Sequence, residues 1–125
     1  MKKTIFLLAA VAAAFVVQPA FADADAGKKV FNKCKACHDA EKEVNKVGPH
    51  LVGIIGRPVG SVEGFKYSKA NQEFGADGKV WDEELLKAYL AKPRDVVKGT
   101  TMAFAGLKKE EEITNILEYF KSLAQ

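Results

Sequence analysis

Cysteine and histidine are scarce in this sequence of 125 residues. The two cysteines are Cys34 and Cys37, and the two histidines are His38 and His50. A structural zinc site takes four nitrogen or sulfur ligands, so it would need all of them, and their spacing fits such a site poorly. A thioredoxin-like dithiol requires a strand followed by a helix, and nothing before Cys34 reads as a strand. Two cysteines so close together would also make a weak disulfide constraint. Zinc binding, dithiol chemistry and a plain disulfide are therefore all disfavoured.

The sequence also lacks internal repeats, low-complexity tracts and any alternating run of strand length. Its N-terminal apolar run, Ile5 to Val17, has 13 residues, fewer than the roughly 20 that span a bilayer. Beyond residue 22 the chain carries 17 basic and 16 acidic residues, a net charge of +1. Nucleic-acid binding calls for a strongly basic face. These absences exclude a repeat protein and disfavour a permanent membrane anchor and a nucleic-acid partner.

The N-terminus has the three parts of a secretory signal peptide. Lys2 and Lys3 precede the apolar run, and Ala20-Phe21-Ala22 matches a cleavage site. We expect residues 1–22 to be removed after Ala22, which leaves residues 23–125 as one domain of 103 residues in the periplasm.

The decisive motif is Cys34-Lys35-Ala36-Cys37-His38. Two thiols three positions apart with a histidine directly behind form the attachment motif for a c-type haem. Two thioethers anchor the porphyrin edge, and the adjoining imidazole is held beneath the iron as an axial ligand. Because haem is attached to this motif outside the cytoplasm, the signal peptide and the motif support each other.

A second axial ligand decides between an electron carrier and an open haem site. Met102 is the only methionine beyond residue 22, lies 64 residues after His38, and falls in a loop between two predicted helices. Methionine more often fills a hydrophobic core, but the haem motif and this loop favour Met102 as ligand. His50 is the rival ligand, although it lies only 12 residues from His38 and directly follows Pro49. An open sixth position is the third alternative.

The segments with helical periodicity predict an all-α fold. Asp25 is expected to cap a first helix that runs to about Lys35 with Val30 and Phe31 on one side. Residues 48–64 contain five glycines and two prolines, which predict turns.

Three more helices are expected. Ser68 is a candidate cap for a short helix, and Asp82 for a longer one that must stop near Ala91, because Pro93 disfavours helix at the residue before it. Lys98 to Thr101 is expected to be loop. The last helix follows three glutamates, Glu110 to Glu112, which suit the positive end of the helix dipole. Its apolar face is formed by Ile113, Ile116, Leu117 and Phe120.

These residues resemble the class I c-type cytochromes, most closely the bacterial cytochrome c2 group, which is kin to mitochondrial cytochrome c. The resemblance covers essentially all of residues 23–125. Besides the haem motif it rests on Gly27–Phe31, Gly48–Gly53, Gly56-Arg57, Phe65–Asn71, Trp81, Tyr89-Leu90, Pro93, Gly99–Gly106 and the terminal helix. It implies a cytochrome c fold, with three main helices, short helices and loops around one covalent haem c. His50 stands where relatives often carry asparagine, and Lys98 where many carry proline.

The resemblance also implies roles for individual residues. Cys34 and Cys37 would carry the thioethers, and His38 and Met102 would be the axial ligands. The carbonyl of Pro49 would accept the other ring N–H of His38. The remaining cofactor-binding residues it implies are Tyr67, Trp81 and Arg57 at one haem propionate, and Asn71, Tyr89 and Thr100 around a buried water and the methionine sulfur. Gly27 and Phe31 would lie against Ile116 and Tyr119, where the first and last helices cross.

The function expected is that of a monohaem electron carrier and not of an enzyme. Single electrons would pass by outer-sphere transfer through an exposed haem edge. Transient electrostatic docking would connect a soluble monomer to membrane redox complexes: a cytochrome bc1-type donor, and an oxidase or a photosynthetic reaction centre as acceptor. Lysines near the motif and the methionine loop could surround that edge, namely Lys33, Lys35, Lys46, Lys92, Lys98, Lys108 and Lys109. The alternative is a haem peroxidase-like or ligand-sensing protein with a labile Met102.

Overall fold

The computed structural model describes residues 9–14 and 22–124. Residues 1–8 and 15–21 of the predicted signal peptide lie outside the described residues. Among the described residues there is no β-strand, and the only β-type pairing is an isolated antiparallel bridge between Pro58 and Val80. The all-α prediction is confirmed. The helices are α1 (Ala24–Val30), the 3-10 helix η1 (Phe31–Lys33), α2 (Lys69–Gly75), α3 (Glu83–Ala91), α4 (Pro93–Val96) and α5 (Glu110–Leu123).

The start and end of the first helix differ from the prediction. Asp23, not Asp25, is the N-cap, and its carboxylate accepts a hydrogen bond of 2.8 Å from the Asp25 amide. Asp25 instead lies in the first turn, where its charge suits the helix dipole. The α-helix ends at Val30 and tightens into η1, so it does not continue to Lys35. The tighter turn leads directly into the haem motif.

The other predicted caps are confirmed. Ser68 Oγ accepts a hydrogen bond from the Asn71 amide at the start of α2, and Asp82 Oδ1 accepts one of 2.7 Å from the Leu85 amide at the start of α3. Helix α3 ends at Ala91, and Lys92 leaves the helical region with φ −147°, as expected of a residue before proline. Pro93 then starts α4, a single turn that the sequence reading missed.

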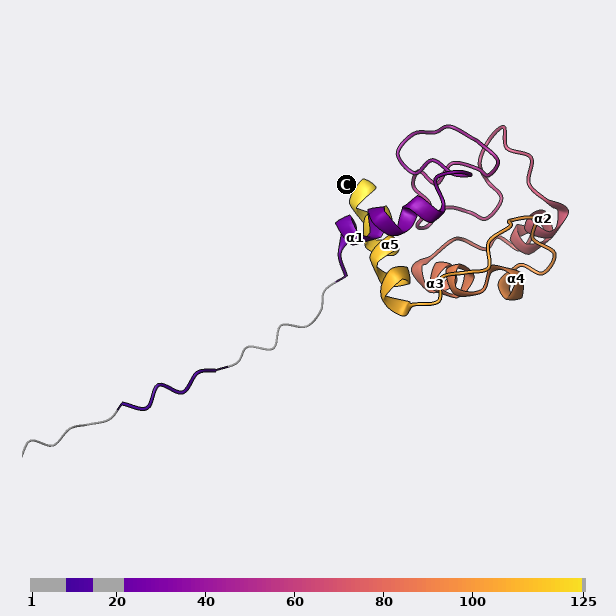
Figure 1. The fold of residues 1–125 in the computed structure, drawn as a ribbon. Coiled ribbons are helices and arrows are strands. Elements are labelled where there is room, and N and C mark those ends of the chain that lie inside the picture. The colour runs from indigo at the N-terminus through magenta and orange to yellow at the C-terminus, as the bar shows by residue number, and fades with distance from the viewer. Residues whose placement is uncertain (1–8, 15–21, 125) are drawn as a thin grey trace, which may run out of the picture.

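Helices α1 and α5 cross in close contact and hold the two ends of the described fold together (Figure 1). A Cβ at Gly27 would lie 1.9 Å from the Asn115 carbonyl oxygen, so only glycine permits this approach. The ring centroids of Phe31 and Tyr119 are 5.7 Å apart at the same crossing. The predicted crossing is confirmed for this aromatic pair, while Asn115 is the closest neighbour of the glycine.

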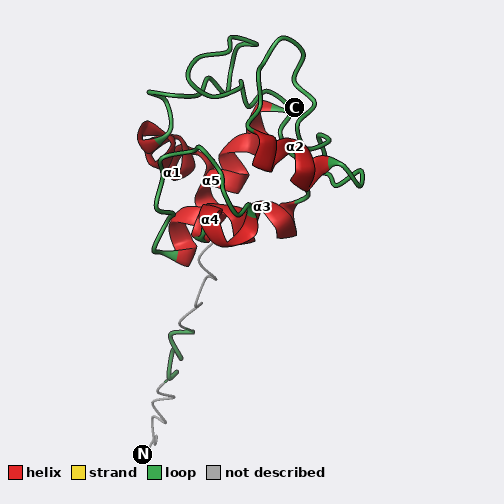
Figure 2. Cartoon of the chain, turned by 90° about the vertical axis from the view of Figure 1, so that its right-hand side faces the viewer, coloured by secondary structure: helices red, strands yellow, loops and turns green. Residues whose placement is uncertain are grey.

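The core joins this crossing to α3 and to the segment that follows α4. Its most deeply buried side chains include Ile116, Leu117 and Val97. Burying one such side chain contributes about 1.5–3 kcal/mol. The long loop of residues 34–65 lies on the opposite side of the molecule from α3 and α4, as both ribbon views show (Figures 1 and 2). No helix within the described residues combines the length and apolar character needed to cross a membrane.

Candidate functional site

A turn that follows η1 positions the Cys-x-x-Cys-His motif. The amide of Cys34 donates to the Phe31 carbonyl at 2.8 Å, and the amide of His38 donates to the Cys34 carbonyl at 2.9 Å. Both thiols are free rather than joined in a disulfide, with Cys34 half-buried and Cys37 exposed. Burial raises the pKa of the Cys34 thiol to about 11, so this sulfur lies in apolar surroundings. The turn places the two cysteines and the histidine on one short segment.

The His38 imidazole is held from two sides. Its Nδ1 lies 2.7 Å from the Pro49 carbonyl oxygen, an acceptor that requires a proton on Nδ1 and leaves the Nε2 lone pair available. A Cβ at Gly48 would lie 2.3 Å from His38 Cε1, so the backbone packs directly against the ring. Burial lowers the pKa of His38, which favours the neutral imidazole that a metal needs. Tautomer and orientation of the ring are thus fixed by the Gly48-Pro49 segment.

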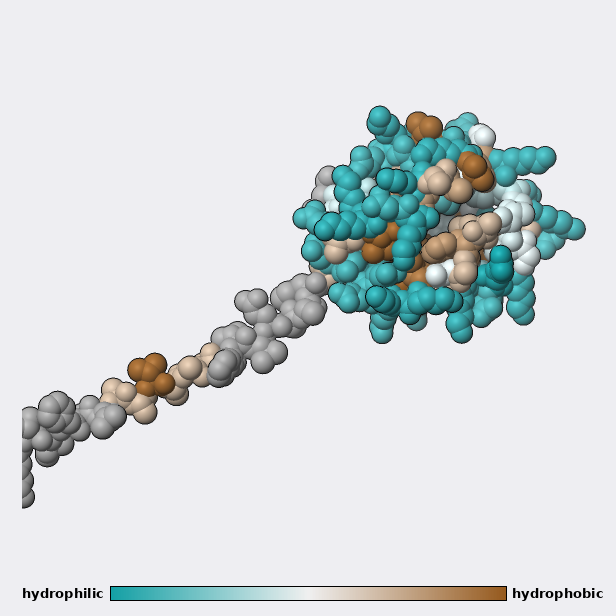
Figure 3. Space-filling model, in the orientation of Figure 1, coloured by the Kyte–Doolittle hydropathy of each residue, from teal (hydrophilic) through white to brown (hydrophobic). Residues whose placement is uncertain are grey.

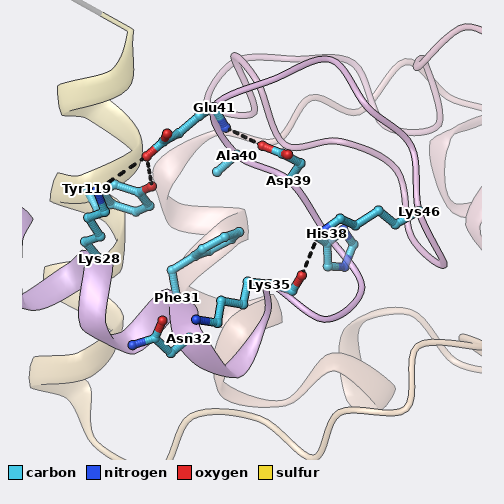
Figure 4. A pocket seen from close by; sticks show the side chains of 10 residues that line it. All are labelled: Lys28, Phe31, Asn32, Lys35, His38, Asp39, Ala40, Glu41, Lys46 and Tyr119. Carbon is cyan, nitrogen blue, oxygen red and sulfur yellow. Dashed lines mark hydrogen bonds and ion pairs between the residues drawn. The ribbon is translucent and has the colours of Figure 1, made fainter.

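Behind His38 lies a cavity of about 240 Å³ between η1, α5 and residues 39–46 (Figure 4). Lys46 lines the cavity, and its ammonium donates to the Lys35 carbonyl at 2.8 Å. The Tyr119 hydroxyl donates to Glu41 Oε1 at 3.1 Å, and Lys28 lies 3.6 Å from the same carboxylate. These contacts connect the terminal helices to the loop that carries Pro49, and so support the position of His38.

Met102 is presented by a loop between two glycines in the left-handed region, Gly99 with φ +85° and Gly106 with φ +110°. Thr100 Oγ1 accepts a hydrogen bond from the Met102 amide at 3.2 Å. The hydroxyl of Tyr89, on α3, donates to the methionine sulfur across 3.6 Å. Burial raises the pKa of Tyr89, so its hydroxyl keeps its proton. Met102 is half-buried, and the two contacts hold its backbone amide and its sulfur.

Arg57 carries an unusual unpartnered group. Its Nη1 donates to the carbonyl oxygens of His50, at 2.9 Å, and Val52, at 3.3 Å, but its buried Nε has no hydrogen-bond partner in the described chain. Burial lowers the pKa of Arg57. A buried guanidinium N–H needs an acceptor, and a carboxylate is the strongest one available. The residues therefore fit a cofactor that brings its own carboxylates, as haem does with its propionates.

The remaining predicted residues surround the same region. The Tyr67 hydroxyl accepts a hydrogen bond from the Val62 amide at 2.9 Å, which leaves its own proton free to donate. Trp81 is 6% exposed, and its ring centroid lies 4.8 Å from that of Tyr89. The buried Oδ1 of Asn71 has no donor in the described chain. Asn71 and Arg57 thus both have polar atoms that the protein alone does not satisfy.

Sequence reasoning missed several contributors to the site. Gly48 entered only as part of a motif, and its contact with the imidazole was not foreseen. Half-buried apolar side chains also pack against the core from the loops and short helices: Leu51, Ile55, Phe74, Val96 and Phe104. Hydrophobic side chains gather in the middle of the face drawn in Figure 3, between hydrophilic borders. The sequence did contain a signal for these side chains, because they are large apolar residues within segments that otherwise read as loop.

The zinc alternative finds no supporting geometry. Across residues 9–14 and 22–124, no three side chains of histidine, cysteine, aspartate or glutamate come together in a way that could hold a metal ion. Cys34, Cys37, His38 and His50 all lie in this part of the chain, so they do not form the four-ligand cluster that zinc would require.

Comparison with known proteins places this arrangement in a family. The sequence model of the cytochrome c family matches residues 24–124. The chain is 50% identical over 98 residues to cytochrome c-550 of Nitrobacter winogradskyi, covering 78% of this chain and 87% of that protein. It is 42% identical over 123 residues to cytochrome c2 of Blastochloris viridis, covering 97% and 93% of the two chains.

The fold agrees with a solved structure. Cytochrome cH from Methylobacterium extorquens superposes with a TM-score of 0.72 at 40% identity, covering 80% of this chain and 98% of that chain. The cytochrome c fold expected from the sequence is confirmed. The chain therefore belongs to the cytochrome c family, as a class I c-type cytochrome of the c2 group: it is a monohaem electron-transfer protein rather than an enzyme, with one haem c attached covalently.

Proposed function

We propose that this cytochrome shuttles single electrons between redox complexes, with Cys34 and Cys37 as the thioether anchors and His38 and Met102 as the two axial ligands. When bound, haem c supplies an iron that cycles between the ferrous and ferric states. The protein's part is to fill both axial positions, exclude water from them and orient the haem. The single observation that carries the assignment is the fixed His38 ring, whose Nδ1 lies on the Pro49 carbonyl and whose Nε2 is left to coordinate.

The polar residues of the site have assigned tasks in this proposal. Arg57, Tyr67 and Trp81 hold one haem propionate, because a buried carboxylate requires donors. Tyr89 and Thr100 position the sulfur of Met102 through the contacts described above. Asn71 completes this polar group with a buried oxygen that needs a donor, such as a water molecule. His/Met ligation in an apolar pocket disfavours the added charge of the ferric state.

We further propose that residues 1–22 are cleaved as a signal peptide and that residues 23–125 work in the periplasm. The haem motif supports this, since its covalent attachment chemistry takes place after export. The same chain would act without stable membrane insertion or nucleic-acid binding, and as a monomer.

Docking to the complexes would use a smaller set of lysines than the sequence suggests. Lys33 pairs with the Glu112 carboxylate at 3.1 Å, so its charge is partly neutralised, whereas Lys46 keeps its charge while it donates to the neutral Lys35 carbonyl. The members of the expected ring that are exposed and make no ion pair within the described chain are Lys35, Lys46, Lys92, Lys98, Lys108 and Lys109. Clustered cations steer acidic partners and raise the association rate.

The proposed partners are a cytochrome bc1-type donor and an oxidase or photosynthetic reaction-centre acceptor. If the lysines steer docking, the rate of electron transfer to such a complex falls as ionic strength rises. Charge reversal at Lys98, beside the Met102 loop, should slow it more than charge reversal at Lys69, which lies on α2. An electron-transfer rate that changes neither with ionic strength nor in Lys98→Glu would exclude this docking surface.

The experiment that tests the ligation is an absorption spectrum of the purified protein in both oxidation states. We expect a haem c spectrum with a methionine-to-ferric charge-transfer band that is absent in Met102→Ala. A colourless protein, or a band that survives this substitution, would refute the assignment. The peroxidase-like or ligand-sensing alternative requires a labile Met102, so carbon monoxide binding by the native ferrous protein would favour it over a carrier.

A further inference from the structure

His50 has no part in the proposed ligation, yet its side chain makes a defined hydrogen bond. The amide of Val52 donates to His50 Nδ1 across 3.2 Å, and the His50 amide donates to Asn45 Oδ1 across 3.0 Å. A side-chain acceptor that takes the amide two residues ahead closes a tight turn, as aspartate and asparagine often do. Residues 50–52 are therefore fixed by the imidazole itself.

This hydrogen bond specifies the protonation state of the ring. An imidazole nitrogen that accepts an N–H carries no proton, so His50 must be neutral, with its proton on Nε2. Protonating Nδ1 would remove the acceptor and leave the Val52 amide without its partner.

The same turn holds Arg57. The two carbonyls that receive the Arg57 guanidinium are those of His50 and Val52, the first and last residues of the turn. The buried Nε of Arg57 is the atom left for the haem propionate. A continuous chain of contacts thus runs from the His50 imidazole through the turn to the cation proposed to lie beside the haem.

We propose that His50 is a positioning residue that sets the haem potential through Arg57. The neutral imidazole fixes the turn, the turn fixes the guanidinium, and the guanidinium disfavours the positive charge of the ferric state. Loss of the Nδ1 acceptor loosens Arg57 and lowers the potential. The inference rests on the proposed haem carrier.

Several charged or titratable groups lie at this turn or next to it. Arg57 is bound to its carbonyls, and Tyr67 interacts electrostatically with Arg57. His38 lies next to the turn, because its Nδ1 is hydrogen-bonded to the carbonyl of Pro49, the residue before His50. The charge of Lys46 interacts electrostatically with His38. The neutral side chain of Asn45 binds the His50 amide. The haem propionate is the remaining charge expected there.

The test compares two substitutions in the holoprotein. In His50→Asn the amide oxygen can accept the Val52 N–H as the imidazole does but cannot be protonated, whereas His50→Leu fills similar space without an acceptor. At pH 8 we expect unaltered and Asn proteins to share one midpoint potential and the Leu protein to have a lower one. A Leu potential equal to that of the Asn protein would overturn the proposal.

A second measurement reads the turn directly and does not depend on electron transfer. The protection of the Val52 amide against hydrogen exchange at pH 8, corrected for the intrinsic rate, should be high in the unaltered protein and in His50→Asn and low in His50→Leu. A Val52 amide that exchanges at its intrinsic rate in the unaltered protein would overturn the proposal, even if the Leu protein failed to fold.

The absorption spectrum separates this inference from the proposed function. If the unaltered protein lacks the haem c spectrum or its methionine band, the proposed ligation fails. If the spectrum is intact in all three proteins while the potentials and the Val52 protection do not differ, only the role of His50 fails.

Discussion

The hydroxyl of Tyr89 donates a hydrogen bond to the sulfur of Met102, with 3.6 Å between oxygen and sulfur. A donor to a thioether withdraws electron density from the sulfur and so weakens its ability to support a ferric iron. The contact also restricts the rotation of a flexible side chain that would otherwise adapt its position. One tyrosine on α3 is thereby expected to affect both the potential and the retention of the ligand.

Replacing Tyr89 by phenylalanine removes this donor and keeps the ring that packs against Trp81. We expect a lower midpoint potential and a Met102 ligand displaced more readily by an added imidazole. Spectroelectrochemistry and an imidazole titration measure both effects. Tyr119→Phe, which alters a hydroxyl bound to Glu41 instead, is the control and should leave the methionine band unchanged. An unchanged potential in Tyr89→Phe would show that the hydroxyl does not act on the sulfur.

Gly48→Ala places a methyl group 2.3 Å from His38 Cε1, a distance that forces the ring or the backbone to move. Gly48 has an ordinary φ, so the backbone tolerates alanine and any effect comes from the imidazole contact. We expect a changed haem spectrum and a loss of about 1–3 kcal/mol in stability. Val47→Ala is the matched control, because its side chain is 80% exposed. A wild-type spectrum and wild-type stability in Gly48→Ala would contradict the contact.

Gly27→Ala should separate α1 from α5. The added Cβ would lie 1.9 Å from the Asn115 carbonyl oxygen and 2.8 Å from Tyr119 Cβ, and neither can retreat without moving a helix. Overpacking of this kind costs about 1–3 kcal/mol or more. Denaturant unfolding measures it, with the exposed Lys29→Ala of the same helix expected to stay within about 0.5 kcal/mol. Similar values for the two variants would mean that the helices do not cross as described.

Tyr119 predicts a loss of stability at alkaline pH. Burial, assisted by the Glu41 carboxylate, raises the pKa of Tyr119 to about 12 from the ordinary value of about 10. Because the folded pKa is raised, the stabilisation is fully present below pH 10 and is lost as the pH rises from 10 to 12. The loss amounts to at most roughly 2–3 kcal/mol. Unfolding free energies measured across this range should decline more steeply in the unaltered protein than in Tyr119→Phe, and parallel curves would refute the shift.

Local patterns were sufficient to predict most of the helices. Asp82 and Pro93 determine the ends of α3 through one cap and one steric clash, and both are visible within a few residues of sequence. The cap of α1 was misassigned because Asp23 and Asp25 are equally good caps by residue type. Asp23 also makes a tertiary contact: its amide donates a hydrogen bond of 2.9 Å to Oδ1 of Asn115, a residue of α5.

The features of the site likewise divide into those that local sequence patterns indicate and those that depend on contacts between distant segments. The haem motif and the Met102 loop are local signals in the sequence, and the ligand roles of His38 and Met102 remain predictions. Contacts between distant segments were not visible: Lys33 was expected on the docking surface but pairs with Glu112, 79 residues away. The contact of Gly48 with His38 depends on how the loop folds back, which no periodicity encodes. The short helix α4 was not predicted, because four residues are too few to show a helical repeat.

The contact between α1 and α5 brings the two ends of the described fold next to each other (Figure 1). A short peptide could therefore join Ala124 to Asp23, and new ends could be opened in the exposed turn at Gly78, between α2 and α3. Such a circular permutant would place the Cys-x-x-Cys-His segment after the Met102 loop instead of before it. The order in which the two segments are synthesised is thus separable from the geometry that brings them together.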